Sequence, residues 1–115
     1  MNDRAQRPED ALTVQSKIWI ARGETVVLSD WRVQLLEAVD REGSLSRAAE
    51  LMDVPYRTAW NRIRESETAL GVRLLETEIG GPAGGGSRLT PEGRDLVQRF
   101  RRVAEGVQQM VAERF

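Results

Sequence analysis

The 115-residue sequence contains neither cysteine nor histidine, and Lys17 is its only lysine. These absences exclude disulfide bonds, zinc fingers and any catalytic centre built on cysteine or histidine. No apolar run approaches the ~20 residues that a membrane-spanning helix needs, and the polar N-terminus does not resemble a secretory signal. We therefore expect a cytoplasmic protein that is not an enzyme, with no metal site, no cofactor and no contact with a membrane.

Net charge is also nearly absent, at −1, but the charges are unevenly distributed. Residues 44–64 hold four arginines against two acids, and residues 88–115 hold six arginines against four acids. Because almost every cation is an arginine, these regions offer planar guanidinium forks, which suit phosphates and guanine edges. An apolar content of 40% and a charged content of 30% at this length indicate one globular domain with a modest core.

The most informative stretch is residues 43–67, where two short helical patterns meet at a tight break. Ser44 is a predicted N-cap for the first helix. The apolar positions of that helix recur at the spacing of one buried face: Leu45, Ala48, Ala49 and Met52. The break is residues 53–55, where Val54 can plug the gap and Pro55 is suited to opening a second helix.

The second helix, from about Tyr56, has two distinct faces at ~100° per residue. One side carries the expected buried positions, which are Ala59, Ile63, Ser66 and Leu70. The opposite side carries groups that suit DNA, which are Arg57, Asn61, Arg64 and Thr68. Two helices joined by such a turn, the second with this face, indicate a helix-turn-helix. The alternative is an ordinary solvated helix pair.

Upstream of this unit the sequence predicts a tail, a hairpin and a supporting helix. Residues 1–14 are polar and lack periodicity, so we expect a loose tail. Residues 17–20 and 25–28 are β-prone runs that predict a hairpin turning at Gly23; the alternative is an irregular arm. Ser29 can cap a helix from Asp30 to about Glu42, and Gly43 can end it.

Downstream, residues 72–77 and 87–89 are predicted strands on either side of the glycine-rich stretch 78–86. A hairpin directly after a recognition helix is the wing of a winged helix, and Arg88 lies at its base, where it can reach phosphate or the minor groove. A phosphate-binding loop of nucleotide enzymes is the competing interpretation. It fails because that motif requires a lysine, and this stretch has none.

Thr90, Pro91 and Glu92 form a strong helix start, and the helical pattern then continues to residue 115. Five apolar residues follow a heptad seam: Leu96, Phe100, Val103, Val107 and Met110. One small domain cannot cover so long a stripe, so we expect the same helix of a second subunit to cover it. The alternative is that the helix packs entirely on its own domain.

These elements predict a mainly α fold with little β structure: a winged helix-turn-helix at residues 15–90 and a long dimerisation helix at residues 91–115. About residues 17–113 also resemble the DNA-binding domain of the molybdate-responsive (ModE-type) transcriptional regulators, relatives of the LysR-type winged helix. The resemblance rests on residues 43–49, 56–60, 77–86 and 89–94. It implies a homodimer, joined mainly through its first and last helices, that binds a palindromic operator.

The chain departs from that family's pattern in the turn and in length. Asp53 stands where glycine is usual, although aspartate tolerates the left-handed conformation better than most residues. Pro55 stands where a serine cap is usual, so one capping hydrogen bond is lost. Full members continue into a separate oxyanion-binding region that these 115 residues do not include, so we do not expect molybdate to bind this chain.

The sequence therefore predicts a homodimeric regulator of transcription that binds double-stranded DNA. Predicted contacts to base edges are Tyr56, Arg57, Thr58 and Asn61; predicted contacts to phosphates or the minor groove are Ser46, Arg47, Arg62, Arg64 and Arg88. Trp60 is expected to support the core or the wing, with DNA contact as the alternative. A second hypothesis is an adaptor, a winged helix that dimerises or docks to a protein without binding DNA. No catalytic constellation supports an enzyme.

Overall fold

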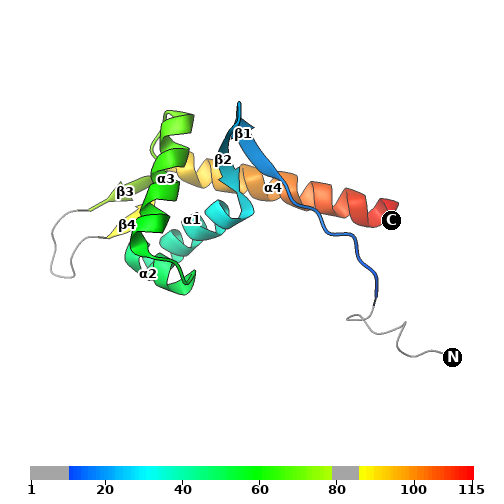
Figure 1. The fold of residues 1–115 in the computed structure, drawn as a ribbon, viewed down its shortest axis with the longest axis horizontal. Helices are drawn as coiled ribbons and strands as arrows, with labels where there is room; N and C mark the ends of the chain where they lie inside the picture. Colours follow the sequence, from blue (N-terminus) through cyan, green and yellow to red (C-terminus); the bar gives the residue numbers. More distant parts are fainter. Residues whose placement is uncertain (1–10, 79–85) are drawn as a thin grey trace.

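The computed structural model describes residues 11–78 and 86–115 and confirms the winged helix-turn-helix architecture. In chain order the elements are β1 (Trp19–Arg22), β2 (Thr25–Ser29), α1 (Asp30–Glu42), α2 (Leu45–Leu51), α3 (Tyr56–Leu70), β3 (Leu75–Thr77), β4 (Ser87–Leu89) and α4 (Pro91–Arg114). The helices α1, α2 and α3 form a head, the wing strands project from it, and α4 extends past it on the other side (Figure 1).

Four of the helix boundaries lie where the sequence predicts them, because local capping sets them. Ser29 Oγ accepts a hydrogen bond from the Arg32 amide (3.3 Å), Ser44 Oγ from the Arg47 amide (3.0 Å) and Thr90 Oγ1 from the Gly93 amide (2.9 Å). At the other end of α1, Gly43 adopts the left-handed conformation, with φ 78°, which a residue with a side chain rarely adopts.

The first hairpin forms, but it is shifted relative to the sequence-based boundaries. β1 begins at Trp19 rather than at residue 17 and runs to Arg22, so the turn contains only two residues, Gly23 and Glu24. The pairing includes an irregularity between Ile20 and Ala21. β2 carries Val27 and Leu28 into the core, whereas every residue of β1 is exposed.

The head has one apolar core, to which all four helices and strands β2, β3 and β4 contribute. Its largest fully buried side chains are Phe100, Leu28, Leu35, Leu36, Leu74, Val27, Val33 and Val39. The start of α4 lies very close to Leu74, the residue before β3. A Cβ added at Gly93 would be only 2.5 Å from the Leu74 carbonyl oxygen. Only glycine fits there, which explains why this helix can begin directly against the wing.

The segment 11–18 lies along the second half of α4 and includes the last residues of the predicted tail. The Gln108 side chain holds it: Oε1 accepts from the Ser16 amide (2.9 Å) and hydroxyl (2.6 Å), and Nε2 donates to the Val14 carbonyl (2.6 Å). Residues 1–10 of that tail, and residues 79–85 of the predicted glycine-rich wing loop, lie outside the described residues. Among the described helices, none is long and apolar enough to cross a membrane.

Candidate nucleic-acid interface

The two helices of the helix-turn-helix meet at a short backbone-bonded turn. The Met52 amide donates to the Ala48 carbonyl and the Val54 amide to the Ala49 carbonyl, both at 3.0 Å. Asp53 adopts φ 55°, the only positive φ of a non-glycine residue in the described parts of the chain. Pro55 precedes α3 without a side-chain capping bond. The turn therefore has the left-handed backbone and the missing cap that the family resemblance implies.

Replacing Asp53 with glycine should raise the free energy of unfolding by about 0.5–1 kcal/mol. A left-handed non-glycine residue carries about 1–3 kcal/mol of strain, and the added freedom of glycine in the unfolded chain offsets part of the gain. Asp53→Ala keeps the steric conflict and is the control, with no stabilisation expected. Thermal unfolding of the three proteins measures this. A lower midpoint for the glycine variant than for the wild type would contradict the strain argument.

The helix α3 is amphipathic as predicted, with its polar face in solvent. Arg57, Asn61, Arg64 and Thr68 are all exposed, as is Tyr56 before them, while Thr58 is half-buried. On the opposite face Ala59, Ile63 and Ser66 are buried, and Leu70 is partly buried. The polar face is thus presented outward by a helix whose other face is fixed in the core.

The buried Ser66 anchors α3 to the neighbouring elements. The sequence pattern predicts only that this position is buried. Ser66 Oγ donates to the Val27 carbonyl at 2.6 Å and accepts from Arg32 Nη1 at 2.9 Å. Arg32 also donates to the Arg62 carbonyl (3.1 Å) and pairs with Glu65 (3.1 Å). This network ties α3 to β2 and α1, and its partners could not be identified from helical periodicity.

The predicted DNA-contacting arginines differ in what surrounds them. Within residues 11–78 and 86–115, Arg47 and Arg57 are exposed and form no ion pair. Arg62 pairs with Glu65 at 3.1 Å, Arg64 with Glu67 at 3.4 Å and Arg88 with Glu76 at 3.0 Å. The Arg62 and Arg88 pairs are exposed on both sides and are worth at most about 1 kcal/mol, so a phosphate can replace the carboxylate there. The Glu67 partner of Arg64 is buried instead, at 6% exposed. Ser46, on the first turn of α2, is also exposed.

Trp60 borders the wing rather than the core. It lines a hollow of about 220 Å³ between α3 and the wing strands, together with Tyr56, Thr77 and Ser87. Trp60 is 43% exposed, and the Arg64 guanidinium lies 5.5 Å from the centroid of its ring, within range of a cation–π contact. Trp60 is thus placed where it can hold Arg64 near the outer face of α3.

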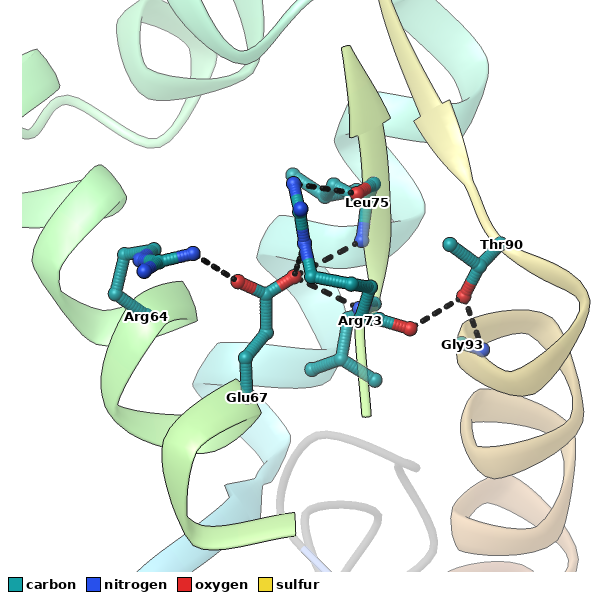
Figure 2. Close-up of polar contacts among 7 residues, drawn as sticks. Arg64, Glu67, Arg73, Leu75, Thr90 and Gly93 are labelled. Atoms are coloured by element: carbon teal, nitrogen blue, oxygen red, sulfur yellow. Dashed lines mark hydrogen bonds and ion pairs between the residues drawn. The ribbon is translucent and has the colours of Figure 1, made fainter. Parts of the chain in front are cut away.

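Glu67 is the main feature of this surface that sequence reasoning missed. Its side chain is only 6% exposed, and it joins the last turns of α3 to the beginning of the wing (Figure 2). Oε2 accepts from the Leu74 amide (2.8 Å), the Leu75 amide (3.3 Å) and Arg73 Nε (3.3 Å), and Oε1 accepts from Arg64 Nη1 (3.4 Å). A buried carboxylate is stable only when paired and hydrogen-bonded in this way.

The strand β3 is shorter than predicted. The sequence favours a strand from residue 72, but β3 begins at Leu75, and the amides of Leu74 and Leu75 donate to the Glu67 carboxylate. Thr90 continues the connection, since its hydroxyl donates to the Arg73 carbonyl at 2.6 Å and caps α4 (Figure 2). The helix α3, the wing and α4 are therefore linked through consecutive side-chain contacts.

The wing strands pair in antiparallel register, with Leu75 opposite Leu89 and Glu76 opposite Arg88. Leu75 and Leu89 are buried under the wing, so Arg88 lies on its exposed side. The Ser87 amide donates to the Gly43 carbonyl at 2.9 Å, which ties the start of β4 to the end of α1. Arg88 lines a hollow with Glu76, Pro91 and Arg94 beside the first turns of α4, whereas Thr77 and Ser87 of the wing strands line the hollow next to α3.

The heptad residues of α4 do not share one environment. Phe100 is 1% exposed and belongs to the core of its own domain, so it has no surface to offer a second subunit. Leu96 also packs against this core. Val103 and Met110 are 54% and 48% exposed, and Val107 is half-buried. The sequence pattern did not separate the two groups, because the head covers only the first half of the helix.

Comparison with known proteins places this arrangement among DNA-binding regulators. The family model of bacterial regulatory helix-turn-helix proteins of the LysR family matches residues 32–94. The chain is 42% identical over 74 residues to the molybdenum transport protein ModE of Azotobacter vinelandii, covering 64% of the chain and 27% of that protein. It is 35% identical over 74 residues to the DNA-binding transcriptional dual regulator ModE of Escherichia coli (strain K12), covering 64% and 28%.

Another relative is the molybdenum-pterin-binding protein MopB of Rhodobacter capsulatus, 35% identical over 81 residues, covering 70% of the chain and 30% of that protein. The chain thus spans less than a third of the length of these relatives. Among solved structures, it is similar to the BenM DNA-binding domain in complex with benA site 1 DNA, with a TM-score of 0.54 and 26% identity. That match covers 72% of this chain and 91% of the BenM chain.

Proposed function

The chain belongs to the LysR family of bacterial regulatory helix-turn-helix proteins, and we propose that it binds a palindromic operator as a homodimer. The observation that carries this proposal is the outer face of α3, where Arg57 and Asn61 are exposed on a helix whose other face is buried. A guanidinium fork matches guanine and a carboxamide matches adenine in the major groove. The similar BenM domain forms a complex with DNA, which supports DNA binding by this chain.

The other predicted contacts lie on α2, on α3 and on the wing, and would position α3 on the duplex. Ser46 and Arg47 lie at the start of α2, and Arg88 lies on the exposed side of the wing. Arg62 would exchange its exposed partner Glu65 for a phosphate at little cost. Arg64 is half exposed and could turn from Glu67 to a phosphate, because Arg73 and the Leu74 and Leu75 amides still donate to that buried carboxylate. Contacts of this second kind give affinity and orientation rather than sequence preference.

The homodimer is proposed from the exposed apolar side of α4. Val103 and Met110 are about half exposed, and a Cβ added at Gly106 between them would meet nothing within 4 Å beyond the backbone of its own helix. A glycine at such a position permits close approach of another backbone. A second copy of the same helix is the proposed occupant, because heptad spacing is the pattern by which helices pair along their length.

These residues are proposed to bind DNA, and no molybdate binding is proposed for this chain. The relatives whose names refer to molybdenum are proteins of which this chain spans 27–30%. Their effector chemistry is therefore not transferred to this chain. The adaptor hypothesis makes the opposite claim about DNA, and the experiment below separates the two.

Alanine replacement should separate base reading from phosphate contact. We expect Arg57→Ala and Asn61→Ala each to cost about 1–3 kcal/mol of operator binding and to relax the preference at one base pair. Arg88→Ala should weaken binding to all sequences alike and make the salt dependence shallower. Fluorescence anisotropy titrations at several salt concentrations measure both effects. A wild-type protein without salt-dependent binding to any duplex would refute the proposal and favour the adaptor.

A further inference from the structure

The helix α4 contacts the head over only its first half. Gly93, Val97 and Phe100 are its buried residues, and Ala104 is the last one packed against the core. Beyond this point α4 continues for a further ten residues to Arg114 and projects away from the head (Figure 1). The direction of the projecting half therefore depends on the contacts that the first half of α4 makes with α1.

Two arginines of α4 bind acids of α1 with both arms of their guanidinium groups. Arg94 Nη1 and Nη2 donate to the two carboxylate oxygens of Asp40 at 3.0 and 3.1 Å. Arg101 Nη2 and Nε donate to the two oxygens of Glu37 at 2.6 and 3.1 Å, and Nη1 donates to Asp30 at 2.8 Å. These contacts, which we call the two forks, lie on either side of the buried Val97 and Phe100.

The charged state of the second fork is strongly favoured. Hydrogen bonds from Gln34 and from Arg101 hold the pKa of Asp30 below its ordinary value. Bonds to Glu37 and Asp30 raise the pKa of Arg101 above its ordinary value. The Arg101 and Glu37 side chains are about one-third exposed, so solvent screens the contact only in part. Bidentate geometry adds directional specificity that a single ion pair lacks.

The spacing of the forks makes them sensitive to the angle of the helix. Arg94 and Arg101 are seven residues apart, which corresponds to about 10.5 Å along α4. A rotation of α4 by ~10° about its first turn would displace Arg101 by ~2 Å, enough to break hydrogen bonds of ordinary length. The apolar contacts between the forks are non-directional and do not resist such a rotation to the same degree.

We propose that the two forks are a positioning device that fixes the angle between the head and α4, and thereby the separation of half-sites that the dimer accepts. This inference rests on the proposed function, in which α4 pairs with its copy and each head reads one half-site. A displacement of ~2 Å in each subunit, in opposite senses across the two-fold axis, approaches the ~3.4 Å step between base pairs. Loosened forks would let the two heads adapt to neighbouring separations.

The test uses duplexes that carry two inverted half-sites at separations differing by single base pairs. The wild-type protein should bind one separation more tightly than its neighbours. In Arg94→Met/Arg101→Met the ratio of these affinities should fall about tenfold. This variant should remain a dimer and should bind an isolated half-site as tightly as the wild type. Arg99→Met/Arg102→Met is the matched control: both residues are exposed on the same helix, and within the described parts of the chain Arg99 pairs only with Asp95 of its own helix, at 3.7 Å. It should keep the wild-type preference.

Two further variants keep the test decisive if the methionine variant fails to fold. Arg94→Lys/Arg101→Lys preserves charge but removes both forks, so it should broaden the accepted separations as well. Asp40→Arg/Arg94→Glu exchanges the partners of the first fork and should restore much of the preference lost by Arg94→Glu alone. If variants without the forks are folded dimers and keep the wild-type preference for one separation, the role of the forks is refuted, whereas the proposed function stands. A wild-type protein that is monomeric, or indifferent to separation, overturns the proposed function and the inference with it.

Discussion

Glu67→Ala is expected to lower the free energy of unfolding by about 3–5 kcal/mol. The substitution removes the acceptor of two backbone amides, those of Leu74 and Leu75, and the partner of Arg73 and Arg64. The arginines can turn to water because both are largely exposed, but the amides remain buried without an acceptor, which costs about 1–3 kcal/mol each. Loss of this size is a large part of the stability of a small domain. Urea denaturation of both proteins measures it.

Glu65→Ala is the matched control for this prediction. Glu65 lies on the same helix and pairs with Arg32 and Arg62 at 3.1 Å, but it is 49% exposed, so its removal should cost at most about 1 kcal/mol. Glu67→Gln retains one carbonyl acceptor for the amides and should fall between the two alanine variants. An alanine variant at position 67 that is as stable as the position-65 variant would refute the structural role of the buried carboxylate.

Val103→Asp/Val107→Asp should give monomers that remain helical and bind the operator at least ~100-fold more weakly. Val103 is 54% exposed and Val107 half-buried in the single chain, so the charges do little harm to the head. In a paired helix they would be buried facing their own copies, without a partner charge, which is strongly unfavourable. Separated heads lose the gain of binding two half-sites together, typically 10²–10⁴-fold. Analytical ultracentrifugation and operator titration measure the two effects.

The control places the same charges on another face of the same helix. Gln109→Asp/Ala112→Asp adds two carboxylates on the side that faces segment 11–18, away from Val103 and Val107. We expect this variant to remain dimeric and to keep most of its operator affinity. A wild-type protein that sediments as a monomer at tens of micromolar would contradict the dimer, whatever the variants do.

Features that depend on neighbouring residues in the sequence were predictable. The three helix starts at Ser29, Ser44 and Thr90 and the left-handed end of α1 at Gly43 were predicted and are confirmed. Each follows from local backbone chemistry: a side-chain oxygen for a free amide, or a residue that tolerates positive φ. The outer face of α3 was predictable for the same reason, because helical periodicity alone assigns it.

Features that depend on contacts across the chain were not predictable in this way. In the sequence, Glu67 is one of several acidic residues on a charged helix. It becomes a buried hydrogen-bond acceptor only because the start of β3 packs against it. Phe100 fits the heptad seam, yet the head covers it. The pairing of Arg101 with Glu37, 64 residues away, leaves no local signal. Sequence spacing identifies which residues share a face, but not what that face meets.

Selection of bound sequences from random duplex DNA tests the central claim most directly, because it assumes nothing about the operator. We expect the wild-type protein to enrich two inverted half-sites whose centres lie about one helical turn apart, 10–10.5 base pairs, and Arg57→Ala to lose the preference at one position of each. Recovery of sequences no different from the starting pool, by a protein that is folded, would contradict sequence-specific DNA binding through α3.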